Sequence, residues 1–202
     1  MIDPMTNAAP KRLLVALTLF VSASLVAPGV SAKPQKGLAI GEPAPRFVLK
    51  TLNPKRSGIP VFSTKKHVGS AATDRKAAVL LSFGASHCGP CKKELPILHT
   101  LVQSFAADNV IAAVIVVDTE AEGIEAMRQF AVDDIGWLGP VVSDRFQIVQ
   151  RRYDAEMLPL NVVIGGDGQV KWFHAGFDAK TPARVEAALR AAIAPVAPKP
   201  TP

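Results

Sequence analysis

The chain has two cysteines, Cys88 and Cys91, and they are separated only by Gly-Pro. An apolar run over 77–83 precedes them and a helical pattern follows, which predicts a strand-to-helix turn at the pair. A helix N-terminus carries partial positive charge and free N–H donors, so it stabilises a thiolate at the first cysteine. The second cysteine, one helical turn further on, can reach a mixed disulfide formed at the first. The spacing therefore predicts a redox-active dithiol with Cys88 as nucleophile and Cys91 as resolving thiol.

Two other uses of the cysteine pair are open. A structural zinc site normally takes four ligands, often from two such pairs. The chain has one pair, and its histidines lack the spacing of zinc ligands; they are His67, His87, His99 and His174. A structural disulfide across so short a loop would contribute about 2 kcal/mol, which a domain of this size hardly needs. Redox chemistry is favoured over both, and we expect no resident metal.

The N-terminal residues have the pattern of an export signal. Lys11 and Arg12 precede an apolar stretch over 13–26, and small residues lead to a cleavage position after Ala32. The stretch is short for a membrane span, which needs about 20 apolar residues. We expect residues 1–32 to be a signal peptide, with an uncleaved anchor as the alternative. Either way, the folded part is expected in the periplasm or at the extracytoplasmic face of a bacterial membrane.

The rest of the chain is long enough for one domain with its own core. We expect a linker over 33–40, a single domain over 41–194 and a mobile proline-rich tail over 195–202. The formal net charge is +6, but the basic residues are scattered, without a long block or interleaved aromatic residues. This pattern does not indicate a nucleic-acid partner.

Apolar runs and helical stripes alternate along the expected domain. The Gly-Gly-Asp-Gly at 165–168 predicts a hairpin, and Thr181 and Pro182 are expected as N-cap and first residue of the last helix. Strands are expected at 47–50, 77–83, 110–117, 141–142, 160–164 and 170–174, and helices after the cysteines, around 124–131, around 146–152 and up to 193. This order predicts an α/β fold, with a central mixed sheet, helices on both faces and a C-terminal β-hairpin plus helix. Residues 51–75 give no clear pattern.

The run FGASHCGPCKKELP at 83–96 carries a resemblance to a known family. It is similar to the active-site signature of the TlpA/ResA-like thiol–disulfide oxidoreductases of the thioredoxin superfamily. Weaker matches are the family's opening motif, shared with peroxiredoxins, its cis-proline segment and its closing hairpin, found here at 41–49, 153–164 and 167–176. The resemblance covers about residues 41–194 and implies a thioredoxin-like fold.

Three further residues are candidates for the site. Pro159 matches the family's cis-proline, which lies beside the dithiol and faces the client; an ordinary trans proline is the alternative. Glu94 matches a family carboxylate that modulates cysteine pKa and passes a proton to Cys91, although a first-turn glutamate would also complement the helix dipole. His87 can lower the Cys88 pKa when it is protonated, or it lies exposed in the loop without effect.

The chain departs from the family pattern near the dithiol. His87 stands where the family usually has tryptophan, and Ser82 stands where thioredoxins keep a buried acid. The usual proton relay through that acid is therefore absent. Leu160 and Asn161 follow the proline, where threonine is usual, so the ordinary chemistry of the substrate groove is in doubt.

The Gly-Pro dipeptide between the cysteines is that of reducing thioredoxins, with a potential of about −270 mV against about −120 mV for a strong periplasmic oxidant. It favours a reductase that acts on disulfides in protein clients without a cofactor. The resemblance implies apocytochrome c or a copper-site protein as client, and a membrane electron donor that recharges the dithiol.

Three alternatives come from other classes. A copper chaperone could use Cys88, Cys91 and a histidine such as His174. A peroxiredoxin needs threonine three residues before its peroxidatic cysteine, and Ala85 stands there. A binding module would use the fold as a surface and would not need its cysteines.

Overall fold

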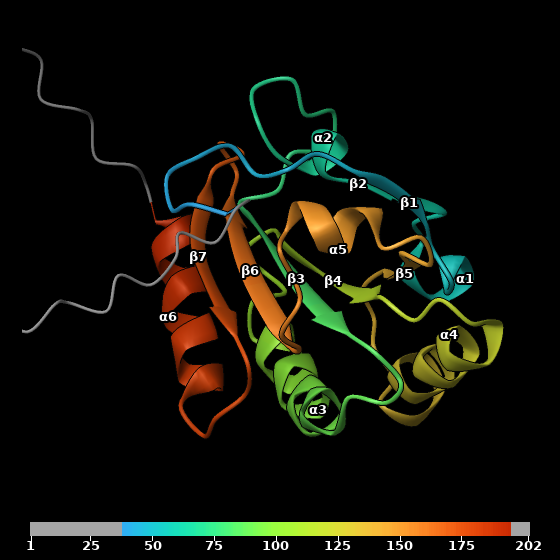
Figure 1. Ribbon diagram of the computed structural model, residues 1–202. Helices are drawn as coiled ribbons and strands as arrows, with labels where there is room; N and C mark the ends of the chain where they lie inside the picture. The colour runs from blue at the N-terminus through green and yellow to red at the C-terminus, as the bar shows by residue number, and fades with distance from the viewer. Residues whose placement is uncertain (1–37, 195–202) are drawn as a thin grey trace, which may run out of the picture. The chain divides into compact units, whose positions relative to one another are not determined.

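The computed structural model of the protein describes residues 38–194. Its centre is a five-stranded sheet in the order β5-β4-β3-β6-β7 (Figure 1). The strands of this sheet are β3 (Ala78–Gly84), β4 (Val110–Val116), β5 (Val141–Ser143), β6 (Leu160–Gly165) and β7 (Val170–Ala175). The helices are α1 (Pro54–Ser57), α2 (Thr64–His67), α3 (Gly89–Gln103), α4 (Ala121–Arg128), α5 (Ile148–Arg152) and α6 (Thr181–Ile193), and a π-helix, η1 (Gln129–Asp134), continues α4.

Strand β3 runs through the middle of the sheet, and all of its residues are buried. It pairs in parallel with β4 and antiparallel with β6, with Phe83 opposite Leu160. Strand β5 adds in parallel beyond β4, and β7 forms an antiparallel hairpin with β6. The predicted parallel sheet that ends in an antiparallel hairpin is thus confirmed.

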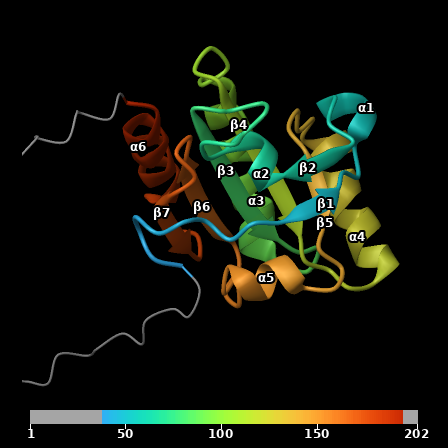
Figure 2. The ribbon, with the colours of Figure 1, turned by 90° about the horizontal axis from the view of Figure 1, so that it is seen from above.

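Side chains alternate along β3, so successive residues point to opposite faces of the sheet, and both faces are covered. Leu80 points to the layer of α3, α4 and α6, where Leu98 and Leu189 are fully buried. Leu81 points to the opposite layer, which is formed by α5 and a small second sheet. Helices α6 and α4 lie at opposite ends of the first of these layers in both views (Figure 2). The expected helices on both faces are therefore present.

The segment 51–75, which has no clear sequence pattern, folds into short elements. Its strand β2 (Val61–Ser63) forms an antiparallel two-stranded sheet with β1 (Val48–Lys50), the strand predicted at 47–50, and α1 and α2 flank β2. Phe62 of β2 is fully buried and stacks on the buried ring of His67. Elements of three or four residues carry too few side chains for a periodic pattern, so tertiary packing rather than local sequence defines them.

The start of α6 differs from the prediction. Thr181 is the first residue of the helix, and Lys180 occupies the N-cap position without a side-chain cap. Thr181 Oγ1 instead accepts the Asp178 N–H at 2.9 Å. The Thr181 hydroxyl therefore closes the turn before the helix rather than the first turn of the helix itself.

The expected signal peptide over 1–32 and the expected tail over 195–202 lie outside the described residues, as does most of the expected linker over 33–40. Leu38 is already buried and belongs to the hydrophobic cluster on the face of the sheet that α5 covers. Within 38–194, no helix is both long and apolar enough to span a membrane.

Candidate active site

The two cysteines lie where β3 passes into α3. Cys88 is the N-cap residue of α3, and its Sγ accepts the N–H of Cys91 at 3.2 Å. The two sulfurs are joined in a disulfide, with the Cα atoms 5.3 Å apart. Both residues are buried, but Cys88, at 8% exposed, is more accessible than Cys91, at 3%. The structure thus places Cys88 at the helix N-terminus, as the spacing predicted, with Cys91 turned toward the core.

Gly84, the last residue of β3, lies beside the inner sulfur. A Cβ at this position would lie 3.5 Å from Cys91 Sγ and 3.3 Å from the methyl carbon of Met127. Cys91 Sγ therefore packs close to the end of the central strand, at a distance that would still allow ordinary van der Waals contact with a Cβ.

The Leu158–Pro159 peptide bond is cis, as the resemblance implied. Phe83 pairs with Leu160 across β3 and β6, so the same register continued by one residue places Pro159 opposite Gly84. The carbonyl of Pro159 accepts the Gly176 N–H at 2.7 Å, which ties this loop to the end of β7. Pro159 therefore lies at the end of the sheet where β3 leads into the loop that carries the dithiol.

Glu94 is buried, with 1% of its surface exposed. It lies three residues after Cys91 on α3, so both side chains project from the same face of the helix. The alternative of a first-turn glutamate that complements the helix dipole is wrong, because Glu94 lies in the second turn and faces the core. Burial raises the pKa of Glu94 to about 7, and a hydrogen bond from Asn161 opposes part of that rise. A carboxyl with this pKa can both take up and release a proton near neutral pH.

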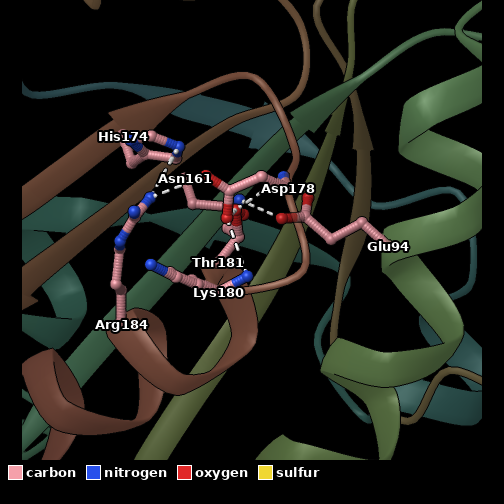
Figure 3. Close-up of polar contacts among 7 residues, drawn as sticks. All are labelled: Glu94, Asn161, His174, Asp178, Lys180, Thr181 and Arg184. Atoms are coloured by element: carbon pink, nitrogen blue, oxygen red, sulfur yellow. Dashed lines mark hydrogen bonds and ion pairs between the residues drawn. The ribbon is translucent and has the colours of Figure 1, made fainter.

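Asn161 is the partner of Glu94. Its Nδ2 donates to Glu94 Oε1 at 2.8 Å, and the asparagine is fully buried (Figure 3). It lies on β6, with Ser82 opposite it on β3 and His174 opposite it on β7. The sequence marked Ser82 and Asn161 as departures from the family but did not connect them with Glu94. Thioredoxins keep a buried acid at the position of Ser82. In this chain the buried acid of the same region is Glu94, which comes from α3.

The loop before Cys88 is held by an aspartate that sequence reasoning missed. Asp118 follows β4, and its carboxylate accepts the Ser86 N–H at 2.9 Å and the Ser86 hydroxyl at 2.7 Å. Nδ1 of His87 lies 3.7 Å from Asp118 Oδ1, while the His87 side chain is 79% exposed. A Cβ at Gly123 would lie 2.6 Å from Asp118 Oδ1, so only glycine leaves the carboxylate in this position. The sequence clue was a carboxylate that follows a buried parallel strand, because functional sites of open α/β sheets form at the carboxyl ends of the strands.

The other histidines do not join the dithiol in a metal site. Within residues 38–194, no group of three or more His, Cys, Asp or Glu side chains is arranged to hold a metal ion. His174 lies on β7, with Nε2 3.5 Å from Nη1 of Arg184. His67 is buried at the end of α2, and His99 lies on α3 beside Trp137. The copper-binding triad considered from the sequence therefore has no support in the described residues.

Comparison with known proteins identifies the family. A model of the AhpC/TSA family matches residues 40–173. The chain belongs to this family. Among curated members of the group, it is 28% identical over 145 residues to the thioredoxin-like protein YneN of Bacillus subtilis, covering 72% of this chain and 76% of YneN. It is 29% identical over 137 residues to the thiol–disulfide oxidoreductase ResA of the same organism, covering 67% of each chain.

Solved structures show the same fold. A Chlorobium tepidum protein assigned to the DsbE thiol:disulfide interchange proteins superposes with a TM-score of 0.64 at 23% identity, covering 78% of this chain and 99% of the other. StoA from Bacillus subtilis superposes with a TM-score of 0.55 at 17% identity, covering 71% and 96%. This AhpC/TSA-family chain therefore has a thioredoxin-like fold and is a thiol–disulfide oxidoreductase similar to ResA.

Proposed function

We propose that this protein is an exported reductase of disulfides in protein clients, and that Cys88 and Cys91 carry the exchange. The observation that supports this most directly is the cysteine pair itself, with Cys88 at the N-cap of α3 and Cys91 buried behind it. A helix N-terminus favours the thiolate form of the outer cysteine, which is the form that attacks a disulfide. The greater exposure of Cys88 than of Cys91 supports a division between a nucleophile and a resolving thiol.

The reaction begins from the reduced dithiol. The Cys88 thiolate attacks one sulfur of a client disulfide, and the other client sulfur leaves as a thiolate. Cys91 then gives its proton to the carboxylate of Glu94 and attacks Cys88 Sγ. The Cys88–client bond breaks, the second client sulfur leaves, and the Cys88–Cys91 disulfide forms. Two electrons pass from the enzyme to the client, so a donor must later reduce the enzyme disulfide.

The residues around the dithiol are assigned supporting roles. Pro159, directly before β6 and opposite Gly84, lies at the end of the sheet where a client chain would approach Cys88. A proline has no N–H to donate, so it leaves the client backbone free to pair with neighbouring carbonyls. His87 is exposed directly before Cys88 and beside Asp118, a position suited to contact with a client.

The proposal also covers the direction of electron transfer, the protein partners and the cellular location. The Gly-Pro dipeptide favours reduction over oxidation, with a membrane electron donor to recharge the pair. Apocytochrome c and copper-site proteins are the proposed clients, on the resemblance to TlpA/ResA-like proteins. The pattern over residues 1–32 supports export to the periplasm or the extracytoplasmic face of the membrane.

A trapping experiment tests the function. In Cys91→Ser, the serine cannot attack sulfur, so the Cys88–client mixed disulfide should persist on a non-reducing gel and dissociate with reductant. Cys88→Ser is the matched control and should trap little, because the outer nucleophile is gone. Identification of the trapped protein distinguishes a cytochrome from a copper-site client. If wild-type protein fails to reduce model disulfides and Cys91→Ser traps nothing from a periplasmic extract, the proposed function is wrong.

A further inference from the structure

A buried amide and a buried carboxyl form a pair, with the carboxyl about one helical turn after Cys91 on α3. Asn161 has none of its surface exposed and Glu94 has 1% exposed, and the hydrogen bond between them spans 2.8 Å. Their elements approach from different directions, Glu94 from α3 and Asn161 from β6 (Figure 3). A buried carboxyl that must change its charge during a reaction needs a partner that tolerates both forms.

We propose that Asn161 is a positioning residue for this site, whose side-chain amide holds the Glu94 carboxyl on the Cys91 face of α3 and bonds it in both its charged and its neutral form. The inference rests on the proposed function and deepens it. Asn161 acts through Glu94 and does not itself touch the reacting sulfurs.

The hydrogen-bonding capacity of the amide carries the argument. Nδ2 donates to Glu94 Oε1, a bond that favours the ionised carboxylate. Within the described residues, Oδ1 of Asn161 is buried and has no partner. Rotation of the amide by half a turn would present Oδ1 as an acceptor for the O–H of protonated Glu94. One neutral side chain thus serves both protonation states, which neither a lysine nor a leucine could do.

The charged groups around the pair are occupied with one another. Asp178 accepts the Lys180 N–H at 2.8 Å and binds Arg184 at 3.1 Å, and Arg184 in turn approaches His174 (Figure 3). On α3, Lys92 and Lys93 are exposed, and across the sheet Ser82 adds no charge. The pKa of Glu94 is shifted by burial and, in the opposite direction, by the Asn161 bond. The Asn161 amide is therefore the polar contact that favours the ionised form of Glu94, whereas burial favours the neutral form.

The pair matters when Cys91 reacts. Glu94 accepts the thiol proton as Cys91 attacks Cys88 Sγ, and the proton returns when a donor reduces the disulfide. Without the amide, burial alone acts on Glu94, so the carboxyl stays protonated to higher pH and accepts the Cys91 proton less readily at neutral pH. Attack by Cys88 on the client does not use this proton.

The first test reads the carboxyl directly. The titration of the ¹³C-labelled Glu94 carboxyl is followed by NMR in oxidised protein, where neither cysteine titrates. Asn161→Leu keeps the volume but removes the donor, and the midpoint should rise by about one pH unit. Ser82→Ala, at the cross-strand neighbour, is the matched control and should leave the midpoint unchanged. If Asn161→Leu does not fold, Asn161→Ala removes the same donor without apolar bulk. An unchanged midpoint in the Asn161 variant overturns the proposal.

The second test measures the step in which Cys91 resolves the mixed disulfide. The pH midpoint for resolution of a preformed Cys88–peptide mixed disulfide should rise in Asn161→Leu, while the rate of Cys88 alkylation stays the same. In a Glu94→Gln background, Asn161→Leu should cause no further change in the pH profile, because no carboxyl remains to titrate. An additional shift in that double variant would show a role independent of Glu94 and overturn the proposal. Loss of all disulfide exchange in wild type would refute the proposed function instead, and the NMR titration would still decide the role of Asn161.

Discussion

Ser86 and Asp118 join the loop before the nucleophile to the end of the neighbouring strand. The Ser86 N–H and hydroxyl both donate to the Asp118 carboxylate, at 2.9 and 2.7 Å. Ser86 lies two residues before Cys88, and Asp118 lies two residues after β4. The carboxylate therefore fixes the backbone that delivers Cys88 to the start of α3, and it also lies beside the ring of His87.

Removal of the Asp118 carboxylate should loosen this loop. Asp118→Ala leaves the Ser86 N–H without its acceptor and should lower the free energy of unfolding by about 1 kcal/mol, since the group can reach water. It should also slow exchange with clients. Asp118→Asn keeps an acceptor for the Ser86 N–H, so its stability should stay near that of wild type. Urea unfolding and stopped-flow reduction of a peptide disulfide measure the two effects.

Gly123→Ala is a matched variant that leaves Asp118 in the sequence. The added Cβ would meet Asp118 Oδ1 at 2.6 Å and must displace the carboxylate. Its effect on exchange should therefore resemble that of Asp118→Ala. Equal exchange rates in wild type, Gly123→Ala and Asp118→Ala would show that the loop does not need this anchor.

The two cysteines should differ in reactivity in the reduced protein. Cys88 caps the helix and is 8% exposed, whereas Cys91 is 3% exposed and packs against Gly84. Limited iodoacetamide treatment followed by mass spectrometry should find Cys88 modified first, by at least about tenfold, because thiolate character and access both favour it. Preferential labelling of Cys91 would reverse the assignment of nucleophile and resolving thiol.

His67 should make stability depend on mildly acidic pH. Burial lowers the pKa of His67 from 6.5, although contacts with Asp74 act in the opposite direction. The unfolded chain therefore binds a proton at this residue more readily than the folded one, so stability falls as the pH drops below 6.5. His67→Phe keeps a ring to stack on Phe62 and should remove this contribution. Urea midpoints measured from neutral pH downward should then fall less steeply in the variant than in wild type.

The sequence was most informative where local patterns and tertiary structure agree. The runs that became β3 and β4 are continuous and apolar because both faces of the sheet are covered, so their burial could be predicted. The Cys88–Cys91 spacing and the cis bond at Pro159 followed from the motif and its resemblance. The elements of 51–75 could not be predicted, because each is too short to show a period.

The contacts that support the dithiol were harder to predict. Glu94 and Asn161 are far apart in the chain, and only the packing of α3 against β6 brings them together. Asp118 and Ser86 meet because β4 lies beside β3. Such pairs depend on strand order and register, which side-chain types along the sequence do not reveal.

Glu94 should make the oxidised protein less stable as the pH rises through neutrality. Its pKa is raised from 4.5 to about 7 in the folded state. Between these values the folded protein holds a proton that the unfolded chain has lost, so the free energy of unfolding decreases with increasing pH. The loss begins near 4.5 and is complete above about 7, where it amounts to about 3 kcal/mol.

Glu94→Gln isolates this effect, because glutamine keeps the shape and an oxygen that can accept the Asn161 N–H but does not titrate. The variant should be more stable than wild type at pH 8 and similar to it at pH 4, roughly the limits set by the two pKa values. Urea unfolding of the oxidised proteins at a series of pH values measures the difference. In the reduced proteins, the same variant should slow the Cys91-dependent step, because the proton acceptor is gone. Parallel stability profiles for wild type and Glu94→Gln across this range would mean that the buried carboxyl titrates like an exposed one, and the proton-transfer role would lose its physical basis.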